Sequence, residues 1–270
     1  MNILLLGNTS DYHSGCKAVI QVIESQLADH HIKSFPPMHN YPLIEWDDVD
    51  WVICNGEGTM HNNRPAANGT LKLIEQAQLC GKPTAIINSV WQNMDPYWIT
   101  LIKNLRYFSV RENLSAEHAQ TIHERLPDVL PDLSYFAPVE IKPCDNTEVV
   151  GQFFDMDSPQ WAQTNINIFE QEWNQIVNVL ADAHYLYTGR HHELYASCVA
   201  KTPFVPHHAN SHKLQGIFYS AGASMPILTQ PISRIECSEF ILKYKDQYPI
   251  IFDWMDSFSP VSINTLLAQS

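Results

Sequence analysis

The chain has 270 residues, of which 45% are hydrophobic and 17% charged, so it is a globular sequence long enough for one large or two small domains. Its formal net charge of −13 excludes general attraction to nucleic acid phosphates, and an anionic ligand must therefore meet a local cluster of cations. The six cysteines are scattered without a CxxC pair, which is typical of reduced thiols and a cytoplasmic location.

Short apolar runs alternate with helical patterns in the first half of the chain, which is typical of βαβ units on a parallel sheet. The opening run Ile3–Leu6 has no basic residues before it and stops at Gly7, so it predicts a strand rather than a signal peptide. No apolar stretch approaches the roughly 20 residues of a membrane span. Further strands are expected at Trp51–Cys54, Thr84–Ile87 and Tyr107–Val110, and helices at Cys16–Leu27, Leu71–Leu79 and from Glu112 onwards.

A segment rich in proline and acidic residues, 127–145, is the expected crossing between two lobes. The alternation then restarts, with strands expected at Val149–Phe153, Tyr185–Tyr187 and Phe204–Val205, and helices at Ile166–Leu180, His192–Val199, His212–Ser220, Ile235–Lys243 and Val261–Ala268. The sequence thus predicts an α/β fold of two Rossmann-like lobes, residues 1–140 and 141–270, that face a central cleft. Ligands in such folds bind beyond the carboxyl ends of the strands.

Polar residues follow the predicted strands of the first lobe, where ligand-binding groups are expected. Asn8 and His13 stand in the first loop, which either binds an anion or a sugar hydroxyl or is a plain turn with a capped helix. Asn55 and Glu57 follow the next strand, and Glu57 either serves as a general acid or base or holds nearby backbone amides. His61 either binds substrate or orders the same loop.

Arg111 ends a later strand, where its guanidinium can reach a carboxylate or phosphate. Glu112 and Ser115 behind it have the pattern of helix-capping residues. Asp132 ends a short apolar run near the lobe junction, and it is either a nucleophile or a turn cap. These residues complete the candidate site of the first lobe.

The second lobe carries two predicted anion sites, both at strand-to-helix turns. One is formed by Arg190 and His192, and the other by Asn210, Ser211 and Lys213, whose alternative role is a solvated helix start. No metal is expected, because the 13 histidines include no HExxH or HxH pattern with a carboxylate at ligand spacing.

Taken in order, these motifs resemble the polysaccharide pyruvyl transferase family, most specifically at Ser109-Val110-Arg111-Glu112 and Arg190-His191-His192. The resemblance implies a two-lobed fold of glycosyltransferase type B (GT-B) and a role in bacterial surface-polysaccharide biosynthesis. It also implies that Arg111, Arg190 and His192 hold the carboxylate and phosphate of phosphoenolpyruvate, and that His192 protonates the enol. The expected partners are the anionic donor and a carbohydrate acceptor, without a cofactor, and peripheral association with membrane-bound glycan assembly machinery is in keeping with that role.

A second resemblance, to retaining β-Kdo glycosyltransferases that use CMP-Kdo, rests on the placement of Glu57 and Asp132. It implies Glu57 as acid/base and Asp132 as nucleophile in a double displacement. Arg190, His192, Ser211 and Lys213 would then contact the nucleotide phosphate. A third hypothesis is a catalytically inactive binding or assembly module that keeps the fold. The pyruvyl transferase hypothesis is preferred because its arginine motifs match most closely.

Overall fold

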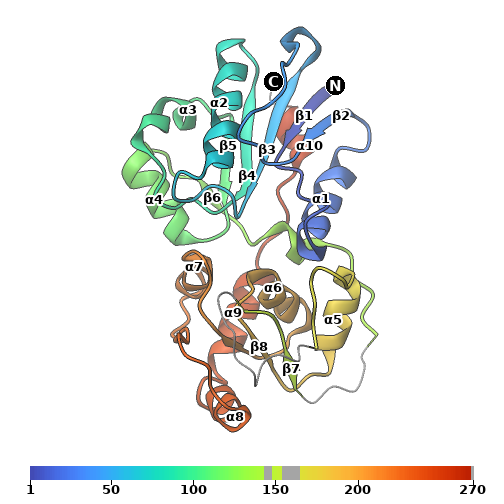
Figure 1. Ribbon diagram of the computed structural model, residues 1–270, viewed down its shortest axis with the longest axis vertical. Helices are drawn as coiled ribbons and strands as arrows, with labels where there is room; N and C mark the ends of the chain where they lie inside the picture. The colour runs from blue at the N-terminus through green and yellow to red at the C-terminus, as the bar shows by residue number, and fades with distance from the viewer. Residues whose placement is uncertain (143–147, 154–164, 269–270) are drawn as a thin grey trace. The chain divides into compact units, whose positions relative to one another are not determined.

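The computed structural model describes residues 1–142, 148–153 and 165–268. Contacts divide the chain into two compact units (Figure 1). Unit 1 comprises Met1–Thr9, Ile20–Asp132 and Pro260–Ser270, and unit 2 comprises Ser10–Val19 and Leu133–Ser259. The expected boundary after residue 140 falls inside unit 2. Two further segments lie in the other unit than expected, because Pro260–Ser270 belongs to unit 1 and Ser10–Val19 to unit 2.

Within the described residues, unit 1 is built on a six-stranded parallel sheet in the order β2-β1-β3-β4-β5-β6. The strands are β1 (Asn2–Leu6), β2 (His31–Phe35), β3 (Trp51–Glu57), β4 (Thr84–Ser89), β5 (Tyr107–Val110) and β6 (Asp128–Val129). The chain leaves β1 for β2 on one side and then crosses to β3 on the other. The carboxyl ends of β1 and β3 therefore form the switch point at which ligands bind in sheets of this kind.

The central strands are apolar because helices cover both faces of the sheet. All residues of β3 and β4 are buried. The edge strand β2 was not predicted, because its sequence HIKSF is polar and none of its residues is buried. Hydrogen-bonded pairing with β1, rather than apolar character, makes it a strand.

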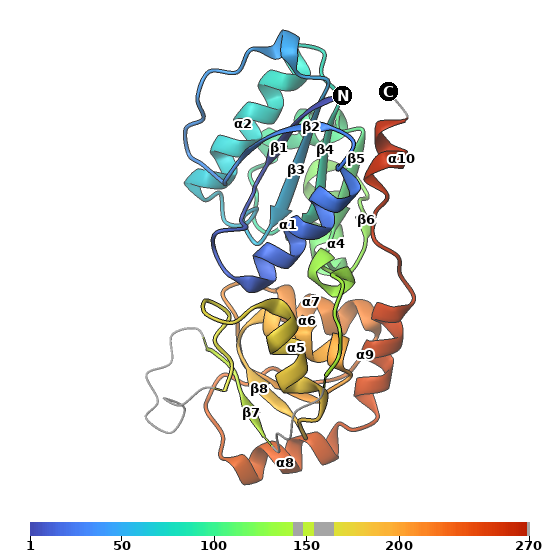
Figure 2. The ribbon, with the colours of Figure 1, turned by 90° about the vertical axis from the view of Figure 1, so that its right-hand side faces the viewer.

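Helices lie on both faces of the unit 1 sheet (Figures 1 and 2). They are α1 (Ser14–Gln26, of which the part from Ile20 belongs to this unit), α2 (Pro65–Leu79), α3 (Ile99–Lys103), α4 (Asn113–His123) and α10 (Ile263–Leu267). One face carries α1 and α10, and the Ile263 amide donates to Gln26 Oε1 at 2.9 Å. The other face carries α2, α3 and α4, which bury a single apolar cluster with the strands.

Among its described residues, unit 2 contains a parallel sheet in the order β7-β8-β9. Its strands are β7 (Val149–Val150), β8 (Leu186–Thr188) and β9 (Phe204–Pro206), and its helices are α5 (Trp173–Ala181), α6 (His191–Ala200), α7 (Lys213–Ala221), α8 (Arg234–Lys243) and α9 (Gln247–Asp256). Helices α5 and α6 contact each other, as do α7 and α9. The Tyr248 hydroxyl of α9 donates to the Phe204 carbonyl of β9 at 2.9 Å.

Two helix predictions in this half need correction. The helix expected over Ile166–Leu180 begins only at Trp173, because Glu172 and Gln175 form a capping box there. Helix α9 was not predicted, although its Pro249 stands in the first turn, where a missing amide costs no helical hydrogen bond. In the part of the chain that is described, no helix is long and apolar enough to cross a membrane. The cysteines found there, Cys16, Cys54, Cys80, Cys198 and Cys237, are free thiols.

The fully buried His123 of α4 predicts a pH-dependent stability. Its ring packs edge-on against Trp91, and burial lowers its pKa to about 4. Between pH 6.5 and about 4 the unfolded chain binds a proton at this residue and the folded protein does not. We expect the free energy of unfolding to fall by up to about 1.4 kcal/mol per pH unit as pH drops through this range.

Urea unfolding of His123→Phe at several pH values measures this term, because the variant keeps an aromatic side chain but no titrating group. Its stability should fall less steeply below pH 6.5 than that of the unmodified protein. His31→Gln, at an exposed histidine, is the matched control and should keep the original slope. Identical slopes for His123→Phe and the unmodified protein would show that His123 is not the titrating group.

Candidate functional site

The switch point of unit 1 is occupied by a hydrogen-bond network around Glu57. The Thr9 hydroxyl, in the loop after β1, donates to the Glu57 carboxylate. The Asn55 amide nitrogen lies 3.3 Å from Glu57 Oε2 and 3.1 Å from the Gly7 carbonyl oxygen. Asn88, in β4, donates to the Asn55 side-chain oxygen at 3.1 Å. The network therefore joins the carboxyl ends of β1, β3 and β4, where the sequence predicted ligand-binding groups.

Two members of this network have unfavourable backbone conformations. Glu57 has φ of 39° and Asn88 has φ of 55°, in the left-handed region that non-glycine residues rarely adopt. Such residues cost on the order of 1–3 kcal/mol each and cluster at functional sites, where the surrounding structure holds them. The Val90 amide does so here by donating to the Glu57 carbonyl at 2.8 Å. Asn88 was not a predicted site residue, and its only sequence signal is its position at a strand end.

Asn8 and His61 have structural contacts that match their alternative interpretation. The Asn8 side chain donates to Ser34 Oγ at 3.1 Å, which fixes the first loop to the end of β2. His61 is 1% exposed, and its Nδ1 lies 3.1 Å from the Asn62 side-chain nitrogen. Both residues order their loops, and their predicted roles in binding substrate remain predictions.

Arg111 and Asp132 form a buried ion pair within unit 1. Their side chains are 1% and 0% exposed, and Arg111 Nη1 lies 2.6 Å from Asp132 Oδ2. Arg111 Nε also donates to the Asn88 carbonyl at 2.9 Å. The sequence predicted a donor-binding arginine and a nucleophilic aspartate, whereas this geometry gives each residue a structural partner. The predicted capping role of Glu112 is confirmed, because its carboxylate accepts the Ser115 amide at 3.0 Å.

In unit 2, two cations stand at the start of consecutive helices after neighbouring strands. The half-buried Arg190 precedes α6, directly after β8, and its amide donates to Thr188 Oγ at 2.9 Å. Lys213 begins α7, after β9, and its ammonium group donates to Asn210 Oδ1 at 2.8 Å. Helix N-termini attract anions through their amides and dipole. Ser211, half-buried, lies in the turn before α7.

Glu193 is a buried carboxyl group beside Arg190 that sequence reasoning did not single out. It is 0% exposed, and it accepts the Gln152 amide at 2.9 Å and the Thr188 hydroxyl. Burial raises its pKa to about 8, although these hydrogen bonds and Arg190 oppose the shift. A glutamate in the first turn of a predicted helix is typical of an exposed acid near a helix start, so its burial has no signal in the sequence.

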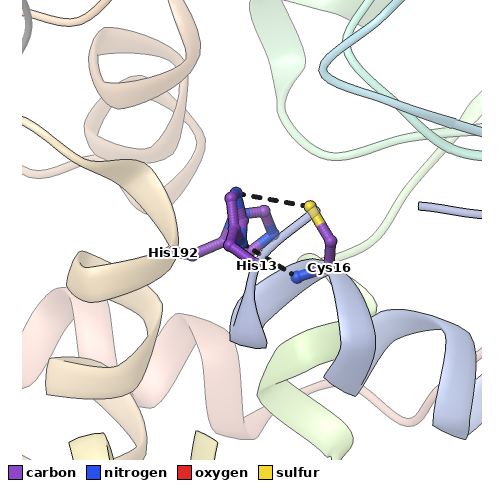
Figure 3. Close-up of side chains that lie close together, drawn as sticks. All are labelled: His13, Cys16 and His192. Atoms are coloured by element: carbon purple, nitrogen blue, oxygen red, sulfur yellow. Dashed lines mark hydrogen bonds between the residues drawn. The ribbon is translucent and has the colours of Figure 1, made fainter. Parts of the chain in front are cut away.

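His13 and His192, predicted as parts of separate loops, lie together in unit 2 with Cys16 (Figure 3). The two imidazole rings are 4.8 Å apart between centroids. His191 packs edge-on against His192, with centroids 4.5 Å apart, and against Tyr195 at 5.2 Å. Cys16 was not a predicted site residue, since an isolated cysteine on an apolar helix is typical of a core residue.

No protein-family profile and no curated protein sequence matches the chain. The solved structures with a similar fold include the following three. A functionally uncharacterised protein of Klebsiella pneumoniae is 12% identical, with a TM-score of 0.56 over 81% of this chain and 87% of that one. MnaA of Staphylococcus aureus, solved with UDP, is 9% identical, with 0.57 over 96% and 92%. A candidate UDP-N-acetylglucosamine 2-epimerase of Listeria monocytogenes is 9% identical, with 0.55 over 99% and 94%.

These similarities establish the fold, but they do not establish a family, a substrate or a reaction. The predicted α/β, GT-B-like class is confirmed by the parallel sheets and by the similar structures. At 9–12% identity the comparison carries no substrate or reaction to this chain. Neither pyruvyl transfer nor Kdo transfer is among the functions that the similar structures name.

Because the ion pair is buried, we expect a single substitution in it to lower the free energy of unfolding far more than the double substitution does. Arg111→Met leaves Asp132 as an uncompensated buried charge, and we expect a loss of about 3–5 kcal/mol in the free energy of unfolding in urea. Arg111→Met combined with Asp132→Leu removes both charges and should regain most of that loss.

The exposed pair of Lys103 and Glu124, 2.6 Å apart, is the control, and Lys103→Met should cost at most about 1 kcal/mol. If Arg111→Met costs no more than Lys103→Met, the ion pair does not stabilise unit 1, and Arg111 is available for ligand binding.

Proposed function

We propose that this chain is a carbohydrate-active enzyme that uses a sugar nucleotide as its anionic donor. Unit 2 binds the donor phosphates at the N-termini of α6 and α7. In unit 1, Glu57 is the candidate general acid or base toward a sugar hydroxyl. The observation that carries the proposal is the pair Arg190 and Lys213 at the starts of helices that follow adjacent parallel strands. In a protein of net charge −13, such a pairing of cations with helix N-termini is a specific means of attracting phosphate.

The fold supports a nucleotide donor over a simpler anion. One similar structure was solved with UDP, and another bears the name of an enzyme that acts on UDP-N-acetylglucosamine. A diphosphate also offers more oxygens to two helix N-termini and two cations than a single phosphate does. The carbohydrate acceptor and a cytoplasmic place of action belong to the same proposal.

Glu57 is suited to proton transfer by its position and its surroundings. It ends β3 at the switch point of unit 1, and its carboxylate is held by Thr9 and Asn55. A carboxylate oriented in this way can accept the proton of a sugar hydroxyl. Its left-handed backbone is the local cost of that orientation.

Pyruvyl transfer from phosphoenolpyruvate is the second candidate, and it is favoured by one observation. Arg190 directly precedes α6 and His192 lies in its first turn, in the Arg-x-His order of the polysaccharide pyruvyl transferase family. The ion pair of Arg111 with Asp132 does not favour the other donor, CMP-Kdo, because a nucleophilic Asp132 would have to leave its buried partner.

The donor is identified by titrating the protein with UDP, CMP and phosphoenolpyruvate in a calorimeter. We expect UDP to bind, and Arg190→Ala to weaken its binding by about tenfold or more, because a charged hydrogen bond to phosphate is lost. Arg234→Ala removes an exposed arginine of the same unit and should leave the affinity unchanged. Binding of phosphoenolpyruvate alone would establish the second candidate, and binding of none of the three would refute both.

The role of Glu57 is tested by Glu57→Gln, which keeps the shape of the side chain but cannot accept the proton. With UDP-N-acetylhexosamine donors and a panel of acceptor sugars, we expect UDP release to slow by about 10²–10⁴-fold. The affinity for UDP should stay within twofold by the same calorimetry. Glu24→Gln, at an exposed position on α1, is the control and should leave both quantities unchanged. A slow Glu57→Gln that also fails to bind UDP would show that Glu57 supports the fold rather than the reaction.

A further inference from the structure

We infer that His13, Cys16 and His192 form a zinc-binding site in unit 2. One ligand atom from each residue can be chosen so that all three lie within 4.8 Å of one another. His13 lies in the loop before α1, Cys16 lies in the first turn of α1, and His192 lies in the first turn of α6 (Figure 3). The inference does not rest on the proposed function, because it concerns only the chemistry of these three side chains.

The separations are close to those of a tetrahedral metal site. With Zn–N bonds of about 2.0 Å and Zn–S bonds of about 2.3 Å, neighbouring ligand atoms stand about 3.3–3.6 Å apart. Cys16 Sγ and His13 Nε2 are 3.3 Å apart. The third ligand reaches this range from at most 4.8 Å by rotation of the His192 imidazole. The site therefore needs a small side-chain adjustment and no change of backbone.

Gly15 is what allows His192 to approach so closely. A Cβ atom at this position would lie 2.5 Å from the His192 ring, closer than real side chains tolerate. The His192 ring therefore packs directly on the first turn of α1, beside Cys16. Phe169 covers the His13 ring edge-on, with centroids 5.7 Å apart, so the ligands have an apolar neighbour.

Zinc binding requires the His13 ring proton to move and the Cys16 thiol to lose its proton. The Cys16 amide donates to His13 Nδ1 at 3.2 Å, which leaves the ring proton on Nε2, facing the sulfur. Metal binding moves that proton to Nδ1, gives up this long hydrogen bond and releases the thiol proton, so one proton leaves per zinc ion. One hydrogen bond weighs little against three metal–ligand bonds.

The donor set favours zinc and leaves a position open. One thiolate and two imidazoles are the mixed sulfur and nitrogen ligands that zinc accepts, whereas magnesium and calcium require oxygen. Three protein ligands leave the fourth tetrahedral position to a water or to a phosphate or carboxylate oxygen. While zinc is bound, His192 is a ligand and is not available to protonate a substrate.

The test uses Cys80→Ser in the 270-residue chain, which removes an exposed thiol outside the cluster. This variant is treated with chelator and titrated with Co²⁺ and then Zn²⁺. We expect one Co²⁺ per chain with a thiolate-to-cobalt charge-transfer band, displaced by one Zn²⁺. Adding Cys16→Ser should abolish the band, and adding His192→Gln should weaken Zn²⁺ binding about tenfold or more. His31→Gln, at an exposed histidine, is the matched control and should change neither.

The first measurement does not depend on whether any ligand variant folds. If folded Cys80→Ser shows no charge-transfer band, the three residues form only a hydrogen-bonded thiol–imidazole cluster and the inference is overturned. A band that survives Cys16→Ser overturns it as well, because the sulfur ligand then lies elsewhere. Neither outcome bears on UDP binding, which is measured separately.

Discussion

The switch point of unit 1 depends on one buried amide, Asn55. Its nitrogen donates to the Gly7 carbonyl and lies near the Glu57 carboxylate, while its oxygen accepts from Asn88. Only a side chain that donates and accepts at once can join the ends of three strands in this way. Gly7 is required for the contact, because a Cβ there would lie 2.2 Å from the Asn55 carbonyl oxygen. The position of Glu57, and with it the proposed proton transfer, follows from this packing.

Two arginines at similar strand-to-helix positions differ in burial. Arg111 is 1% exposed, and a guanidinium removed from water requires a counter-charge, which Asp132 supplies. Arg190 is half-buried and stacks over the Phe169 ring at 5.7 Å, so its charge can exchange solvent for a ligand. The family resemblance treats both arginines as donor ligands. The ion pair gives Arg111 a structural partner, whereas donor binding by Arg190 belongs to the proposed function.

Sequence periodicity predicted most of the fold for a simple reason. Strands buried on both faces must be continuous apolar runs, and β1, β3, β4 and β5 are of this kind. The polar edge strand β2 was missed because it is defined by hydrogen bonds to β1 and not by burial. The start of α5 was misplaced because apolar residues before Trp173 are buried without being helical.

The sequence by itself determined the α/β class, the order of the buried strands with most of the helices, and the placement of polar residues after strands. These follow from local patterns of burial and turn chemistry. The tertiary structure decided which polar residues meet. It paired Arg111 with Asp132, and it brought Cys16 and His13 to His192 over Gly15. Such contacts depend on strand order and helix packing between residues far apart in the chain, and a single sequence carries no local signal of either.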